Sequence, residues 1–294
     1  MELLEGVGLE STFVETGGVR LHVMQAGPVG GEPVILLHGF PEFWYGWRHQ
    51  IPTLAEAGYR VWAPDQRGYN LSDKPCDIGS YDLDTLAKDV LGLIQATGQE
   101  KVRLVGHDWG AAVAWWVATR YPDKLEKLVI LNVPHPLVMG EMLRKSWAQL
   151  RRSWYIFFFQ LPKLPEWALL ANDCQGGLEM LRRSGRPGTF SPEDLERYKQ
   201  AWQQPHAMRG MIHWYRAAAR KMLWGSPRDI RIPVPTLVLW GVNDLALGEE
   251  LIQPSLDLCT DARLVLFEDA THWVQHDEAE RVKRYVLEFF AQGA

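Results

Sequence analysis

The sequence predicts an α/β protein with a mostly parallel eight-stranded sheet and an inserted helical cap. Three observations support this prediction: eight short apolar or alternating runs, helical stretches between most of them, and one long interval without a strand pattern. Strands that alternate with helices form parallel sheets with right-handed crossovers. With 294 residues, 47% of them hydrophobic, the chain can bury a full core.

The eight runs can be placed in chain order. Glu10–Glu15 and Val19–Gln25 are joined at Gly17-Gly18, which predicts an antiparallel hairpin. The other six runs are typical of buried parallel strands: Val34–Leu37, Val61–Ala63, Val102–Val105, Leu128–Leu131, Thr236–Leu239 and Arg263–Phe267. Helices are expected between them, for example over Thr85–Thr97 and Ala111–Arg120.

The interval between the strands near Leu131 and Leu239 is too long for one crossover and is rich in Trp, Tyr, Phe and Arg. Ser191-Pro192-Glu193-Asp194 is a capping box with Pro at the first helical position, so a helix begins there. We expect a helical cap over residues 134–228 and an α/β core over residues 1–133 and 229–294. Such a cap would close a site at the strand ends and exclude water.

Gly106-His107-Asp108-Trp109-Gly110 has the pattern of a nucleophile elbow, because it follows a β-branched strand and precedes an Ala-rich helix. Gly106 and Gly110 suit a turn in which strand and helix approach too closely for side chains. Most elbows carry Ser at the centre, where this chain has Asp108. The alternative is an Asp that only caps the following helix. The two flanking glycines favour the nucleophile.

The change from Ser to Asp108 restricts the chemistry. A serine that attacked an alkyl carbon would form an ether, which water does not readily cleave. A carboxylate forms an ester instead, and a histidine-activated water can hydrolyse that ester at its carbonyl carbon. Asp108 therefore indicates substrates with an electrophilic sp³ carbon, such as epoxides or haloalkanes.

A nucleophile of this kind needs a base, and the base needs an orienting acid. His272 follows the last predicted strand, and Asp244 follows the strand before it. The chain order nucleophile, acid, histidine is that of the α/β-hydrolase fold. A structural loop histidine is the alternative for His272, and Asp269 and Asn132 compete with Asp244 because both also lie near strand ends.

The oxyanion hole is expected to use the backbone N–H groups of Phe40 and Trp109. Pro41 is a candidate for a cis bond that turns the Phe40 amide inward. His38 and His107 adjoin these motifs and are interpreted as packed, hydrogen-bonded neighbours, with His38 the nearer to the site.

An aromatic, apolar pocket is expected from Phe40, Trp109, Phe157–Phe159 and several cap tryptophans. The predicted substrate-binding residues are His38, Pro41, Trp44 and Phe159. Such a pocket favours lipophilic or aryl substrates over small polar ones.

The motifs together resemble those of the epoxide hydrolases of the α/β-hydrolase fold, from about Phe13 to Phe290. The segments that carry the resemblance are His38-Gly39-Phe40-Pro41-Glu42, Asp65-Gln66-Arg67-Gly68-Tyr69, the elbow, Leu131-Asn132-Val133-Pro134-His135-Pro136, Gly241-Val242-Asn243-Asp244 and Thr271-His272-Trp273. Members of this family carry two cap tyrosines that hydrogen-bond the epoxide oxygen and protonate it. Trp154–Pro162 resembles the first tyrosine segment and Ile212–Arg216 the second, so the resemblance assigns these roles to Tyr155 and Tyr215.

The two phenols also make chemical sense. An epoxide leaves as a strongly basic alkoxide, and a phenol with a pKa of about 10 is a suitable proton donor at neutral pH. The alternative for each tyrosine is packing within a Trp-rich cap. Tyr45, Tyr69 and Tyr198 are interpreted as structural.

Three other functions compete with this one. Haloalkane dehalogenases resemble the chain at the elbow, but that family typically has Asn where this chain has Phe40, which removes one halide donor; Trp109 remains. Fluoroacetate dehalogenases use arginines after the elbow, and the run Ala111–Trp116 contains none. A non-catalytic small-molecule receptor on the same fold is the third, and the set Asp108, Asp244 and His272 argues against it.

Composition limits the partners. A net charge of -5 without basic blocks argues against nucleic acid, and Cys76, Cys174 and Cys259 are too widely spaced for a metal site or a disulfide framework. No apolar run reaches membrane-spanning length, and the N-terminus lacks the pattern of a signal peptide. We therefore expect a cofactor-free cytoplasmic enzyme, a monomer or homodimer, with no membrane partner and a lipophilic epoxide substrate whose hydrolysis detoxifies it.

Overall fold

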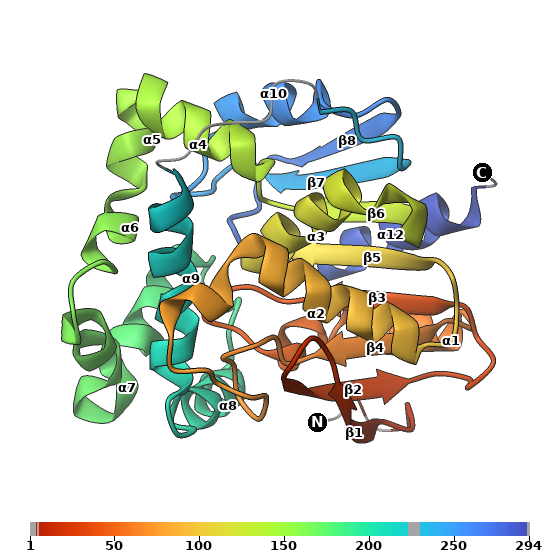
Figure 1. Ribbon diagram of the computed structural model, residues 1–294, viewed down its shortest axis with the longest axis horizontal. Helices are drawn as coiled ribbons and strands as arrows, with labels where there is room; N and C mark the ends of the chain where they lie inside the picture. The colour runs from red at the N-terminus through yellow and green to blue at the C-terminus, as the bar shows by residue number, and fades with distance from the viewer. Residues whose placement is uncertain (1–3, 5, 223–229, 293–294) are drawn as a thin grey trace.

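The computed structural model describes residue 4 and residues 6–222 and 230–292 (Figure 1). Within these residues one eight-stranded sheet has the order β1-β2-β4-β3-β5-β6-β7-β8. The strands are β1 Glu10–Glu15, β2 Arg20–Ala26, β3 Pro33–Leu37, β4 Arg60–Pro64, β5 Val102–His107, β6 Leu125–Leu131, β7 Thr236–Gly241 and β8 Ala262–Phe267. The predicted mostly parallel eight-stranded sheet is confirmed.

The strand directions explain where a site can form. β1 pairs antiparallel with β2, as the hairpin at Gly17-Gly18 predicts, and β2 pairs antiparallel with β4. From β4 onward every neighbouring pair is parallel. The carboxyl ends of these strands therefore meet at one edge, and ligands gather at that edge in open α/β sheets.

The sheet is buried on both faces because successive side chains of a strand point to opposite sides. In β3, Ile35 and Leu37 join one core cluster, whereas Val34 and Leu36 join the other. The first cluster includes residues of α2 (Leu83–Ala96) and α3 (Trp109–Arg120). The second includes residues of α1 (Gln50–Glu56) and α12 (Ala279–Ala291). Continuous apolar strands are thus required on both faces.

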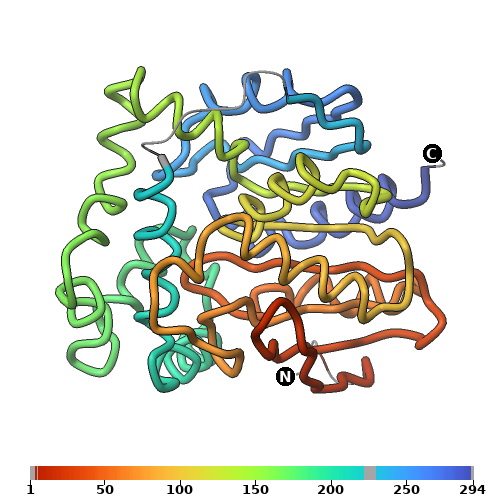
Figure 2. Tube along the Cα trace, viewed as in Figure 1, coloured from red at the N-terminus to blue at the C-terminus, as the bar shows by residue number. Residues whose placement is uncertain are grey.

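The helices between β6 and β7 form a separate layer at the carboxyl edge of the sheet (Figure 1). They are α4 Pro136–Lys145, α5 Trp147–Arg152, α6 Trp154–Phe158, α7 Leu164–Ser184, α8 Pro192–Trp202 and α9 Ala207–Met222. Figure 2 follows the chain into this layer after β6. The predicted boundary at 228/229 lies outside the described residues, and the division into core and cap stays a prediction.

Shorter elements complete the description. They are η2 Trp44–Trp47, η3 Ile78–Tyr81, η4 Pro122–Lys124, η5 Glu249–Leu251, α10 Ile252–Leu256 and α11 Val274–Asp277. α8 begins with the predicted capping box: the Ser191 hydroxyl accepts from the Asp194 amide at 3.1 Å, and the Asp194 carboxylate accepts from the Ser191 amide at 2.9 Å. In the described part of the chain, every helix is too short or too polar to cross a membrane.

Buried polar contacts fasten the helical layer to the sheet. The Trp202 indole donates to the Pro41 carbonyl at 2.6 Å, and the Trp214 indole donates to the Arg67 carbonyl at 2.9 Å. The Tyr198 hydroxyl donates to Glu42 at 2.6 Å. Each bond pairs a buried polar group that would be costly to leave unpaired, so the layer has a defined position above the strand ends.

Candidate active site

The elbow between β5 and α3 holds Asp108 in an unusual backbone conformation, with φ 48° and ψ −124°. A residue other than glycine adopts positive φ only when its surroundings impose it, and such residues cluster at functional sites. The close approach of strand and helix imposes it here. A Cβ at Gly110 would lie 2.1 Å from the Leu37 carbonyl oxygen, and a Cβ at Gly106 would lie 2.6 Å from the Ala111 Cα.

The Asp108 carboxylate faces other loops at the strand ends. Its side chain makes no capping hydrogen bond to α3, which excludes the helix-cap alternative for this arrangement. Instead Oδ1 accepts from the Phe40 amide at 2.6 Å, and Oδ2 lies 3.5 Å from His272 Nε2. The carboxylate is thus aligned between a backbone donor and an imidazole.

His272 and Asp244 stand on the loops after β8 and β7, which are neighbours in the sheet. His272 Nδ1 donates to Asp244 Oδ2 at 2.7 Å, so Nε2 is turned toward Asp108. The Asp244 side chain is fully buried and also accepts from the amides of Ala246 at 2.8 Å and Leu247 at 3.0 Å. These donors keep a buried carboxylate ionised without water.

The two rivals of Asp244 have other positions. Asp269 is exposed. Asn132 is buried after β6; its side-chain amide donates to Asp244 Oδ2 at 3.0 Å, and its side-chain oxygen accepts from the Gly241 amide at 2.8 Å. Asn132 therefore holds the acid in place, a role that the sequence analysis missed. Its position directly after a buried strand was the available signal.

The three groups control one another's protonation. Burial lowers the pKa of His272, but the Asp244 and Asp108 carboxylates outweigh burial and raise it to about 10. Burial raises the pKa of Asp108, but His272 and the Phe40 amide outweigh burial and hold it below its ordinary value. The resting site at neutral pH is thus an anionic Asp108 beside a cationic His272.

The expected oxyanion donors lie on either side of Asp108. The Phe40–Pro41 peptide bond is cis, as predicted, and the Phe40 amide donates to the Asp108 carboxylate. Trp109 is the first residue of α3, where a backbone N–H has no partner within the helix. A donor from each loop therefore lies next to the carboxylate.

Tyr155 of α6 and Tyr215 of α9 line the same cavity as Asp108. Their rings are 5.9 Å apart at 84°, and the Tyr215 ring lies 4.9 Å from Trp109. Burial, and then the charge of Asp108, raise the pKa of both phenols. Both phenols therefore keep their protons at neutral pH and can donate hydrogen bonds.

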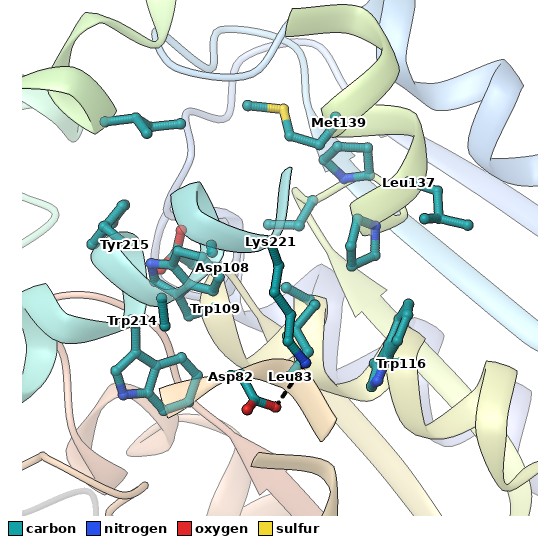
Figure 3. A pocket seen from close by; sticks show the side chains of 18 of the residues that line it. Asp82, Leu83, Asp108, Trp109, Trp116, Leu137, Met139, Trp214, Tyr215 and Lys221 are labelled. Atoms are coloured by element: carbon teal, nitrogen blue, oxygen red, sulfur yellow. Dashed lines mark ion pairs between the residues drawn. The ribbon is translucent and has the colours of Figure 1, made fainter. Parts of the chain in front are cut away.

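The cavity measures about 270 Å³ and runs from Asp108 to α4 and the start of α2. In Figure 3, Asp108, Trp109 and Tyr215 gather at one end and Trp116 and Leu137 at the other. Most of the lining is apolar, and it includes Val133, Met139, Ile156, Trp214 and Leu247. Lys221 also contributes to the lining and pairs with Asp82 and Asp84.

The four predicted substrate-binding residues do not line this cavity, and the prediction is corrected accordingly. His38 is fully buried and accepts from the Gln66 amide, whereas Pro41 binds the Trp202 indole through its carbonyl. Trp44 donates its amide to Asp65. Phe159 packs behind Tyr215 at 4.7 Å and against Phe40 at 5.3 Å. These residues support the site from outside.

Arg216, next to Tyr215, connects the two tyrosine helices. Its guanidinium donates to the carbonyls of Phe159 at 3.0 Å and Leu161 at 2.7 Å, directly after α6, and pairs with Glu166 at 2.6 Å. The sequence analysis quoted Arg216 only as part of a motif. The contacts show that it fixes the end of α6 to α9.

A buried polar network lies behind His272. His107 Nε2 donates to the His272 carbonyl at 2.8 Å, in agreement with its interpretation as a hydrogen-bonded neighbour. Glu42 accepts from His276 at 2.8 Å and from Gln275 at 3.0 Å. Burial raises the pKa of Glu42, but His276 and His107 outweigh burial and hold it well below its ordinary value. The loop that carries His272 is thus braced by an ionised, satisfied carboxylate.

Comparisons with known proteins agree on one family. A model of the α/β hydrolase fold matches residues 32–279. The AB hydrolase superfamily protein YfhM of Bacillus subtilis is 45% identical over 96% of this chain and 98% of its own length. Epoxide hydrolase 1 of Caenorhabditis elegans is 37% identical over 96% of this chain and 70% of its own length. The chain belongs to the epoxide hydrolases of the α/β-hydrolase fold.

Solved epoxide hydrolases have the same architecture. The Bacillus megaterium epoxide hydrolase in complex with an inhibitor is 29% identical with a TM-score of 0.87, covering 96% of this chain and all of that one. Epoxide hydrolase A from Mycobacterium thermoresistibile is 31% identical with a TM-score of 0.86, covering 96% and 98% of the two chains. The helical layer over the strand ends is therefore included in the match to this family.

Proposed function

We propose that this protein hydrolyses lipophilic epoxides to vicinal diols through an alkyl ester on Asp108. The observation that carries the proposal is the alignment of Asp108 with His272 and Asp244 at one end of an apolar cavity that Tyr155 and Tyr215 also line. A carboxylate nucleophile, a paired imidazole and two neutral phenols are the groups that ester formation and ester hydrolysis from an epoxide require.

In the first step a carboxylate oxygen of Asp108 attacks one epoxide carbon, and the bond from that carbon to the ring oxygen breaks. The Phe40 amide already holds Oδ1 at 2.6 Å, so Oδ2 is the attacking oxygen and Oδ1 becomes the ester carbonyl. A phenol of Tyr155 or Tyr215 donates its proton to the departing oxygen, which would otherwise leave as an alkoxide.

Ester formation prepares the base for the second step. Asp108 loses its charge on alkylation, and this removes one of the two carboxylates that raise the pKa of His272. The lowered pKa releases the imidazole proton, and neutral His272 then takes a proton from water as that water attacks the ester carbonyl. The Phe40 and Trp109 amides stabilise the tetrahedral oxyanion, whose collapse frees the diol and restores Asp108.

The test of this activity compares two products from one preparation. Aryl and alkyl epoxides should yield diols, and haloalkanes of the same size should release little halide, because Phe40 offers no side-chain donor to a leaving halide. Gas chromatography of the diols beside halide titration makes the comparison. Halide release without diol formation would replace the proposal with a dehalogenase, and no turnover of either class would favour a receptor.

Removing the phenols should slow epoxide opening selectively. We expect Tyr155→Phe or Tyr215→Phe to reduce the alkylation rate roughly ten- to a thousandfold, because one general acid typically contributes 10²–10⁴-fold and the other phenol remains. The double variant should be nearly inactive. Rapid-quench measurement of ester formation checks this, with Tyr59→Phe, which packs on Phe290 behind the sheet, as the matched control. A double variant as fast as the parent would make both tyrosines packing residues.

Acidification should slow only ester hydrolysis. Asp108 has a lowered pKa and stays ionised as the pH falls below neutral, so alkylation continues. Neutral His272 is lost as the pH falls through its pKa in the ester, so the ester should accumulate in intact-mass spectra. NMR titration of Asp108→Asn, which has the neutral charge of the ester, should give His272 a lower pKa than in the parent. Equal pKa values in the two proteins would contradict this coupling.

A further inference from the structure

The outer side of the helical layer carries an unusual group of exposed apolar side chains. Ten large apolar side chains are exposed among the described residues, and six of them fall within residues 147–167. We call these six the aromatic face: Trp147, Trp154, Phe157, Leu161, Leu164 and Trp167. Monomeric proteins rarely expose contiguous apolar surface of this kind without a partner.

The aromatic face lies on consecutive elements at the margin of the molecule. α5, α6 and the beginning of α7 follow one another along the edge farthest from the sheet (Figure 1). Trp154, Phe157, Leu161, Leu164 and Trp167 recur every three or four residues. Trp147, Trp154 and Trp167 are 80%, 64% and 67% exposed, so these rings project into solvent.

The charge around this face is opposite to that of the whole chain. Residues 141–168 contain five Lys or Arg residues and two acids, although the chain has a net charge of -5. The two acids are engaged: Glu141 pairs with Lys145, and Glu166 pairs with the buried Arg216. Arg144, Arg151 and Lys163 make no ion pair among the described residues. The face is therefore aromatic and cationic together.

We propose that the aromatic face docks the protein on the surface of an anionic phospholipid membrane. Trp and Phe rings partition into the interfacial region of a bilayer, and unpaired Lys and Arg side chains are attracted to anionic headgroups. A second copy of the chain fits the charge less well, because a twofold interface would place the same unpaired cations opposite one another.

The sequence analysis expected no membrane partner because no run is long enough to span a bilayer. Peripheral docking needs no spanning segment. The inference has a consequence if the proposed function also holds: Tyr155 and Ile156 of α6 line the cavity, whereas Trp154 and Phe157 of the same helix are exposed. Docking would then bring the cavity close to the phase in which lipophilic epoxides dissolve. Membrane binding itself does not depend on that activity.

Vesicle flotation tests the proposal without an activity assay. The protein should float with vesicles of equal parts phosphatidylcholine and phosphatidylglycerol, and at least about tenfold less with phosphatidylcholine alone. Trp154→Gln/Trp167→Gln and Arg151→Glu/Lys163→Glu should each weaken the first partition coefficient by at least about tenfold. Both variants alter exposed side chains, so unfolding temperatures should match that of the parent.

Matched controls change the same chemistry elsewhere. Leu71→Gln removes an exposed apolar side chain outside the aromatic face, and Lys88→Glu/Lys101→Glu reverses two exposed charges, so both variants should float like the parent. The proposal is overturned if the parent does not float with anionic vesicles, or if the controls lose binding as much as the test variants. It is also overturned if the parent is a dimer that Trp154→Gln/Trp167→Gln dissociates, because a second copy then covers the face.

Discussion

Replacing Asp108 by alanine is expected to abolish epoxide opening, with a loss in kcat on the order of a millionfold, as for nucleophiles of other covalent hydrolases. No other described carboxylate lines the Asp108 end of the cavity, because the remaining acids in its lining, Asp82 and Asp84, pair with Lys221. The variant should be at least as stable as the parent, because alanine removes a buried charge. Diol formation and the unfolding temperature measure the two effects.

Isotope labelling and a matched variant make this prediction specific. A single turnover in ¹⁸O water should place the label in Asp108, and further turnovers should carry it into the diol. Asp269→Ala, which removes an exposed acid near the same loops, should leave turnover unchanged. Label in the diol of the first turnover would mean that water attacks the epoxide directly, and Asp108 would then not be the nucleophile.

His272→Gln should separate the two half-reactions. Alkylation needs no base, so the variant should still form the ester, whereas loss of the base should slow ester hydrolysis by roughly 10³-fold or more. Intact-mass spectrometry should therefore show the protein plus one epoxide. The trapped ester would also establish directly that the epoxide carbon becomes bonded to the protein.

Two further variants limit the interpretation of the trap. Asp244→Asn should slow the same half-reaction less, because Asp244 acts through His272 and does not touch the substrate. His206→Gln changes an exposed histidine and should leave turnover unchanged. If His272→Gln turned over normally with no trapped ester, a different base would have to serve the reaction.

The backbone of the site could be predicted from local sequence patterns. Each buried strand is a short apolar run, and the residues directly after β5, β7 and β8 must lie at one edge once the strands are parallel. Gly106 and Gly110 indicated the elbow because contacts within a few residues of the turn exclude side chains there. The choice between Asp244 and Asp269 was harder, because both follow a strand and only burial separates them.

The cavity lining could not be predicted in the same way. Trp116 of α3, Leu137 of α4, Lys221 of α9 and Leu247 of the loop after β7 meet there from distant parts of the chain. No local period or motif shows which side of a helix will face a space enclosed by another layer. Phe159 illustrates the difficulty, since an aromatic residue next to a tyrosine motif packs behind Tyr215 instead of facing the cavity.

The sequence by itself determined the sheet, the elbow and the residue types able to form and hydrolyse an ester, because these depend on spacing of a few residues and on side-chain chemistry. The tertiary structure decided which residues enclose the cavity, how Asn132 and Arg216 hold the reactive groups, and which aromatic rings remain exposed on the outer helices. Those properties depend on how the helical layer packs over the strand ends. That packing is fixed by contacts between segments far apart in the chain, such as Trp202 with Pro41 and Trp214 with Arg67.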